Sequence, residues 1–200
     1  MAAITAEIVK QLREKSGVGM MDCKRALEET GGDMEKAFDL LRTKGLAKAE
    51  KRAGRVTKQG LVYSYIHTGG TIGVLIELNC ESDFVARTDA FVELAKNIAM
   101  HVAASNPLAL DRASVPPDVV AREKAIHMDA AQATGKPPAI VEKIAEGKMA
   151  KFYEDNCLLS QKFIKDPERT IQDLLNEAIA KIGENISLRR FTRYQLGEEL

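Results

Sequence analysis

The stretch Leu61–Leu78, which reads LVYSYIHTGGTIGVLIEL, decides the fold of this chain. Apolar residues recur at every second position in its later half, Ile72, Val74, Ile76 and Leu78, which is the period of a β-strand with one buried face. Between the two halves stands Thr68-Gly69-Gly70-Thr71, whose glycines suit a tight turn. We therefore predict a β-hairpin with strands at 61–67 and 72–78.

The second predicted strand runs into residues 79–87, NCESDFVAR, and a helical pattern begins near Thr88. This order places Asp83 and Phe84 at a corner between a strand and a helix. In one interpretation Asp83 caps a helix and Phe84 joins the core. In the other, the pair forms a wedge: the ring inserts between elements of a partner while the carboxylate disturbs a charged site there. The residues alone do not choose between these interpretations.

The first 45 residues predict three short helices that form a miniature bundle. Each has an expected capping side chain and an expected stop, and the apolar residues between them recur at helical spacing. The expected caps are Thr5, Asp22 and Asp33, and the expected stops are Ser16-Gly17, Gly31-Gly32 and Gly45.

Between the first two helices we expect a short loop, Gly17-Val18-Gly19-Met20-Met21, that carries two large apolar side chains. The methionines either complete the core of the bundle or form a surface for a partner, because methionine side chains are flexible and adapt to many contacts.

Residues 42–58 form the most basic run of the chain, with seven Lys or Arg and one acid, Glu50. We interpret this run as a solvated connecting helix, with contact to RNA or to an acidic partner as the alternative. No aromatic residues are interleaved with the charges, so the run does not resemble a platform for stacking bases. The whole chain balances 29 Lys+Arg against 29 Asp+Glu, which argues against bulk electrostatic binding of nucleic acid.

The second half of the chain predicts mainly helices and a late strand. Expected elements are a helix from Pro116-Pro117 to Gly135, another from Pro137-Pro138 to about Tyr153, a last helix opened by Thr170 and Asp173 and stopped by Gly183, and a strand over 186–196. The fold class is therefore α+β, with a small antiparallel sheet packed with helices. We expect two domains: residues 1–54, the three-helix bundle plus a basic linker helix, and residues 55–200, the α+β core.

Composition excludes several classes of protein. With 200 residues, 45% of them apolar, the chain is ordered and can bury a core without disulfides or metal. The cysteines, Cys23, Cys80 and Cys157, are odd in number and far apart, which indicates buried, reduced thiols. No apolar run approaches the roughly 20 residues of a membrane span, and residues 1–14 lack the pattern of a leader. We expect a soluble cytoplasmic protein.

No motif for catalysis, nucleotide binding or metal binding is present. The sequence lacks a phosphate-binding loop, a dinucleotide-binding glycine pattern, a nucleophile elbow and a zinc motif. The three histidines, His67, His101 and His127, fall on different elements, and we expect each of them to be structural or exposed. We therefore expect no enzyme activity, no metal and no cofactor.

Four segments resemble bacterial elongation factor Ts, the family of guanine-nucleotide exchange factors for elongation factor Tu. Residues 12–27, LREKSGVGMMDCKRAL, resemble the N-terminal signature of the family. Residues 79–87 resemble its T-D-F-V signature, with Ser82 where threonine is usual, so that the hydroxyl is kept. Residues 99–105 and 180–186 are similar to two further family segments, and the resemblance spans nearly the whole chain.

The resemblance implies a ubiquitin-associated-like (UBA-like) N-terminal domain that binds the GTPase domain of elongation factor Tu. Carried over by position, Arg13, Met20 and Met21 are contacts of this domain. Ser82, Asp83, Phe84 and Val85 are implied in displacing Mg²⁺ and opening the nucleotide site, and His67 is implied as a further contact. The shorter family members are associated with homodimers and two-to-two complexes.

The resemblance implies an exchange factor without chemistry of its own, which needs no cofactor and touches neither nucleic acid nor membrane. The alternative is a protein-interaction adaptor that binds a peptide or a ubiquitin-like partner through the N-terminal bundle, with the core as scaffold.

Overall fold

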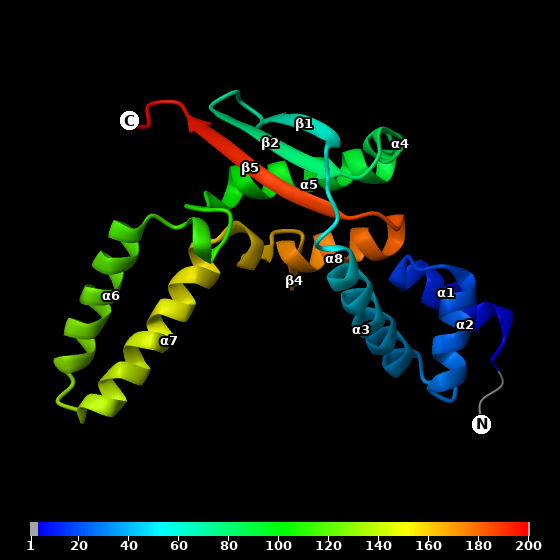
Figure 1. Ribbon diagram of the computed structural model, residues 1–200, viewed down its shortest axis with the longest axis horizontal. Coiled ribbons are helices and arrows are strands. Elements are labelled where there is room, and N and C mark those ends of the chain that lie inside the picture. The colour runs from blue at the N-terminus through cyan, green and yellow to red at the C-terminus, as the bar shows by residue number, and fades with distance from the viewer. Residues whose placement is uncertain (1–3, 200) are drawn as a thin grey trace. The chain divides into compact units, whose positions relative to one another are not determined.

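The computed structural model describes residues 4–199, which form helices, one three-stranded sheet and one small hairpin (Figure 1). The chain divides into two compact units. The first comprises the residues up to Tyr63, Glu77–Ala95 and Asp173–Arg189, and the second comprises Ser64–Ile76, Lys96–Gln172 and the residues from Arg190 on. The α+β class is confirmed.

The N-terminal bundle has the three helices expected from the sequence: α1 (Ala6–Ser16), α2 (Met20–Glu29) and α3 (Met34–Arg52). Thr5 caps α1, and Gly17 ends it in the left-handed conformation, φ 67°, that glycine adopts without strain. Asp33 caps α3 through the backbone N–H groups of Glu35 and Lys36. The bundle core contains Val9, Leu12, Cys23, Ala26, Leu27, Ala37 and Leu41.

Two boundaries in this bundle were predicted wrongly. The cap of α2 is Gly19, and Asp22 lies in the first turn of the helix, where Arg25 and Lys48 contact its carboxylate. The hydrogen bond from Arg25 is the main reason why the pKa of Asp22 lies below its usual 3.8. Helix α3 does not stop at Gly45 but continues to Arg52. A Cβ at Gly45 would lie 3.4 Å from the Ala180 side chain, so this glycine allows close packing inside the helix.

The sheet has the strand order β1-β2-β5, formed by β1 (Gln59–Ile66), β2 (Ile72–Cys80) and β5 (Ile186–Gln195). The predicted hairpin is confirmed: His67 donates its backbone N–H to Ile72 across the turn. One face of β2 is buried through Val74, Ile76, Leu78 and Cys80, the alternation that the sequence predicts. Gly60 lies so close to β2 that a Cβ there would meet the Leu78 carbonyl oxygen at 2.2 Å.

Four of the remaining helices were predicted in this order: α5 (Asp89–Ser105), α6 (Pro117–Gln132), α7 (Pro138–Asn156) and α8 (Ile171–Ile182). The short helix α4 (Asp83–Ala86), which precedes α5, was not predicted as a separate element. Short 3₁₀ turns lie at Arg112–Ser114 and Leu158–Ser160. Prolines open both α6 and α7, and the two helices lie side by side (Figure 1). The short antiparallel hairpin of β3 (Lys162–Phe163) and β4 (Asp166–Thr170) was not predicted.

Candidate partner-binding site

The strand-to-helix corner lies in the first unit, between β2 and α4. Strand β2 ends at Cys80, and Ser82 then caps the single-turn helix α4, its hydroxyl accepting the backbone N–H of Val85 at 3.4 Å. The Cys80 thiol donates to the Ser82 carbonyl oxygen at 3.1 Å. Burial raises the pKa of that thiol, which favours its neutral form. The cap is thus Ser82 rather than Asp83.

Phe84 points into solvent at this corner, with 80% of its surface exposed. Ala86 on the same turn is buried and anchors α4 to the unit. Asp83 forms an ion pair with Arg87 at 3.0 Å on the exposed side of the turn. The interpretation that Phe84 belongs to the core is therefore excluded, because a large apolar ring is held outside it.

A carboxylate from the turn after α8 holds this corner in place. Glu184 accepts three hydrogen bonds: from the Glu81 N–H at 3.1 Å, from the Ser82 N–H at 3.0 Å and from the Ser82 hydroxyl at 2.6 Å. The contact is reciprocal, since Glu81 accepts the Asn185 N–H at 2.6 Å. Sequence reasoning missed Glu184, although the residue lies within a segment that was singled out for its resemblance.

The residues that the resemblance implies as N-terminal contacts lie at the junction of α1 and α2. Met20 and Met21 are 41% and 65% exposed, and they open α2 instead of lying in a loop. Arg13 is exposed in the last turn of α1. The bundle core is formed without these side chains, so the methionines are available as an apolar surface.

His67 lies in the second unit, at the turn between β1 and β2. It is exposed, and its Nδ1 lies 3.1 Å from the Tyr65 hydroxyl. The two rings are 6.1 Å apart between centroids. The ring planes are tilted by 46°, so the pair presents an angled surface at the hairpin tip.

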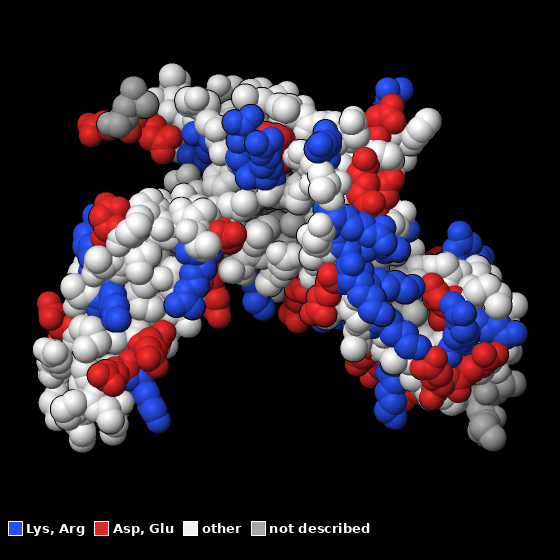
Figure 2. Space-filling model, in the orientation of Figure 1, with Lys and Arg blue, Asp and Glu red and all other residues white. Residues whose placement is uncertain are grey.

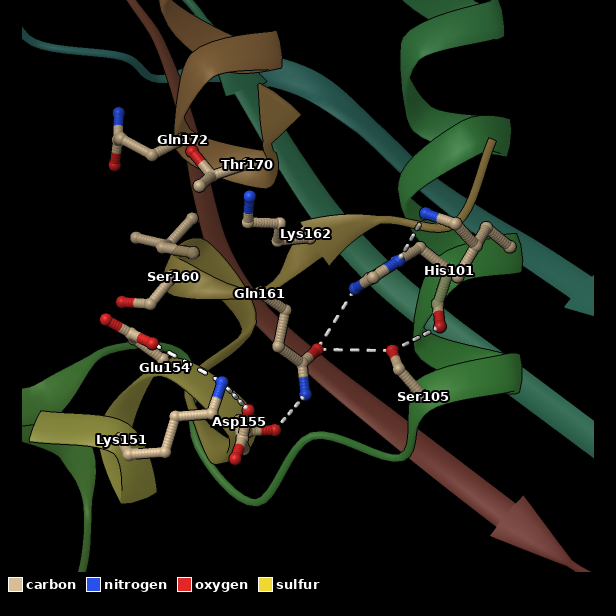
Figure 3. A pocket seen from close by; sticks show the side chains of 12 residues that line it. His101, Ser105, Lys151, Glu154, Asp155, Ser160, Gln161, Lys162, Thr170 and Gln172 are labelled. Atoms are coloured by element: carbon tan, nitrogen blue, oxygen red, sulfur yellow. Dashed lines mark hydrogen bonds and ion pairs between the residues drawn. The ribbon is translucent and has the colours of Figure 1, made fainter. Parts of the chain in front are cut away.

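A hollow of about 630 Å³ lies elsewhere in the second unit, lined by residues of α5, α7 and the β3–β4 region (Figure 3). At its wall His101 is buried, with Nε2 3.0 Å from the Gln161 side-chain oxygen and Nδ1 3.4 Å from the Ile164 N–H. Burial lowers the pKa of His101 below its usual 6.5. Lys151 on the rim pairs with Asp155 at 2.8 Å. His101 and Ser105 both contact the Gln161 side-chain oxygen, and Lys151 pairs with Glu154 and Asp155, so these groups of the wall contact one another.

The described residues lack two further features, a metal-binding cluster and a helix able to cross a membrane. Within 4–199 no group of three or more His, Cys, Asp or Glu side chains could hold a metal ion. All three cysteines are free and buried, as predicted. In the same range, no helix is both long and apolar enough to cross a membrane.

The basic run, residues 42–58, occupies the second half of α3 and the residues after it. Its side chains form a blue band along that helix (Figure 2). Acidic neighbours offset much of it, with the ion pairs Arg42–Asp173, Lys44–Glu29, Lys48–Asp22 and Arg55–Glu81 at 2.6 to 3.6 Å. The Arg52 side chain donates to the Ile179 carbonyl oxygen at 3.2 Å. Most basic side chains of the run therefore contact other residues of this chain.

Comparison with known proteins identifies the relatives of this chain. Residues 48–198 match the model of a family described as Elongation factor TS. A protein of Syntrophobacter fumaroxidans named Elongation factor Ts is 61% identical over 196 residues, which cover 98% of each chain. Proteins of the same name from Syntrophomonas wolfei and Fervidobacterium nodosum are 60% and 58% identical over 195 residues, 98% of this chain and 91% and 99% of theirs.

Proposed function

The chain belongs to the elongation factor Ts family of translation elongation factors, and we propose that it is a guanine-nucleotide exchange factor. In this proposal it binds elongation factor Tu in the GDP form and promotes release of GDP and Mg²⁺, so that GTP can bind. The observation that carries the proposal is the exposed ring of Phe84 on a braced corner. Family membership supplies the class of partner.

The proposed mechanism is mechanical and uses no reacting group. A GTPase holds GDP through a phosphate-binding loop and a Mg²⁺ ion that demands near-ideal octahedral geometry. Phe84 inserts between elements of the GTPase domain, and Asp83 disturbs the charged groups beside the ion. Ser82 and Val85 set the backbone of the turn that presents the pair. The nucleotide loses contacts and dissociates faster.

A second contact positions the wedge. We propose that Arg13, Met20 and Met21 bind the GTPase domain through the N-terminal bundle, and that His67 touches the partner from the hairpin tip. Exposed methionines suit such a surface because they adapt to a partner at little cost. The proposal treats residues 1–54 as the docking domain and 55–200 as the exchange domain, acting in the cytoplasm without direct contact to nucleic acid or membrane.

We also propose that the chain forms a homodimer and a two-to-two complex with its partner. In the second unit the strands leave Ile66, Leu75 and Tyr194 exposed at 65%, 46% and 65%. Apolar sheet residues in water favour association with another surface. The mass of the chain in solution, and of its complex, tests this: twice 22.0 kDa for the free protein agrees with the proposal, and 22.0 kDa contradicts it.

Separate binding and exchange measurements distinguish an exchange factor from an adaptor. An exchange factor obeys linkage: if it weakens the binding of GDP to elongation factor Tu, GDP must weaken the binding of the factor by the same ratio. We expect that reciprocity in titrations with and without GDP. We expect Phe84→Ala to reduce exchange more than binding, whereas in an adaptor Met20→Ala with Met21→Ala would abolish binding and GDP would have no effect.

A further inference from the structure

The corner that carries Phe84 depends on one side chain that is distant in sequence. Phe84 lies on a helix of a single turn, which has too few internal hydrogen bonds to hold its own geometry. What fixes the turn is the Glu184 carboxylate, which binds the N–H groups of Glu81 and Ser82 and the Ser82 hydroxyl. Bonds to a carboxylate are stronger than neutral ones.

The Ser82 hydroxyl takes part in two hydrogen bonds. It donates to Glu184 Oε1 at 2.6 Å and accepts the Val85 N–H at 3.4 Å as the cap of α4. A hydroxyl has one proton to donate, so its donation to Glu184 leaves the lone pairs oriented toward the helix. Glu184 therefore sets the orientation of the cap and, through it, the direction in which the turn presents Phe84.

A second carboxylate ties this arrangement to the end of α3. Glu81 accepts the Asn185 N–H at 2.6 Å and pairs with Arg55 at 3.6 Å. The Asn185 amide donates to the Arg55 carbonyl oxygen at 2.8 Å. Residues 53–55, 81–82 and 184–185 thus form one hydrogen-bonded cluster inside the first unit.

We propose that Glu184 is a positioning residue for nucleotide exchange, which holds the Glu81–Ser82 backbone so that Phe84 is presented in its working direction before the partner arrives. This inference rests on the proposed exchange function. A preorganised wedge avoids the entropy cost of ordering the turn at the moment of binding. Loss of Glu184 therefore acts through Phe84 and not through a contact of its own.

The test is the rate of release of a fluorescent GDP analogue from elongation factor Tu, measured as a function of factor concentration up to saturation. We expect Glu184→Ala to lower the maximal rate at least fivefold. Glu184→Gln should recover only part of the rate, because its amide oxygen still accepts the backbone N–H groups but its amide nitrogen cannot accept the Ser82 hydroxyl proton. Glu142→Ala removes an exposed glutamate from α7 and serves as the matched control.

A double-mutant cycle separates positioning from general destabilisation. If Glu184 acts through Phe84, the variant with both Glu184→Ala and Phe84→Ala is no slower than Phe84→Ala alone. Additive losses, or a maximal rate for Glu184→Ala within twofold of wild type, overturn the inference. If Glu184→Ala does not fold, the maximal rates of Ser82→Ala and Ser82→Thr are compared instead. Only threonine keeps the hydroxyl that bonds to Glu184, so Ser82→Ala should be the slower variant. No acceleration by the wild-type chain overturns the proposed exchange function itself, a result distinct from the others.

Discussion

Replacing Phe84 by alanine isolates the proposed wedge, because the ring contributes almost nothing to the fold. A phenylalanine side chain buries about 150–250 Å² when fully covered, and the 80% of Phe84 that is exposed therefore amounts to roughly 160 Å². At about 25 cal/mol per Å², covering that area in a complex stabilises the complex by up to ~4 kcal/mol. An alanine at position 84 would retain only a small part of this binding free energy. Reorganisation of the partner offsets some of the remainder.

We therefore expect Phe84→Ala to lower exchange activity between about 10-fold and 100-fold, since each 1.4 kcal/mol is a factor of ten. The assay is GDP release at saturating and subsaturating factor, with thermal unfolding in parallel. The stability should stay within about 0.5 kcal/mol of wild type, as for exposed substitutions in general.

The control for Phe84 is Leu196→Ala, because Leu196 is exposed to the same 80% but lies far along the chain from the corner. We expect no change in exchange for this variant. Equal losses from both substitutions, or an unchanged rate for Phe84→Ala, would refute the reasoning.

Three other predictions concern the bundle, the sheet and the core. Met20→Ala with Met21→Ala should weaken binding to elongation factor Tu about 10-fold at unchanged melting temperature, measured by titration calorimetry; unaltered affinity would contradict the docking role. Gly60→Ala should lower the free energy of unfolding by about 1–3 kcal/mol in urea titrations, because its φ of 145° and the Leu78 carbonyl oxygen leave no room for a Cβ. Burial lowers the pKa of His101 in the folded state, so the unfolded chain takes up a proton on this imidazole at a higher pH than the folded chain does. The free energy of unfolding therefore falls as the pH drops below about 6.5. The difference between wild type and His101→Asn in urea unfolding should then shrink with falling pH, and a constant difference would be the opposing result.

Local signals in the sequence predict most of the elements and their ends. Thr5, Gly17 and Asp33 mark helix boundaries because caps and left-handed glycines act within a few residues. The alternation in β2 likewise reports a buried face directly. Gly45 misled the prediction, because its role is close packing against Ala180, a contact that no local pattern encodes.

The sequence predicted only part of the candidate site. The Asp83-Phe84 pair stands out locally, yet its direction depends on Glu184, about a hundred residues away. The β3–β4 hairpin is likewise held by a residue distant in sequence, since Ile164 in its turn donates its N–H to His101 Nδ1 at 3.4 Å. Such partners are fixed by the tertiary fold, so only the structure identifies them.

The most direct test of the central claim is release of a fluorescent GDP analogue from elongation factor Tu with substoichiometric amounts of this chain. An exchange factor is released by the incoming nucleotide and acts repeatedly. We predict that a small molar fraction of the wild-type chain empties the whole GTPase population much faster than spontaneous release. A release rate identical to that of elongation factor Tu alone would contradict the account.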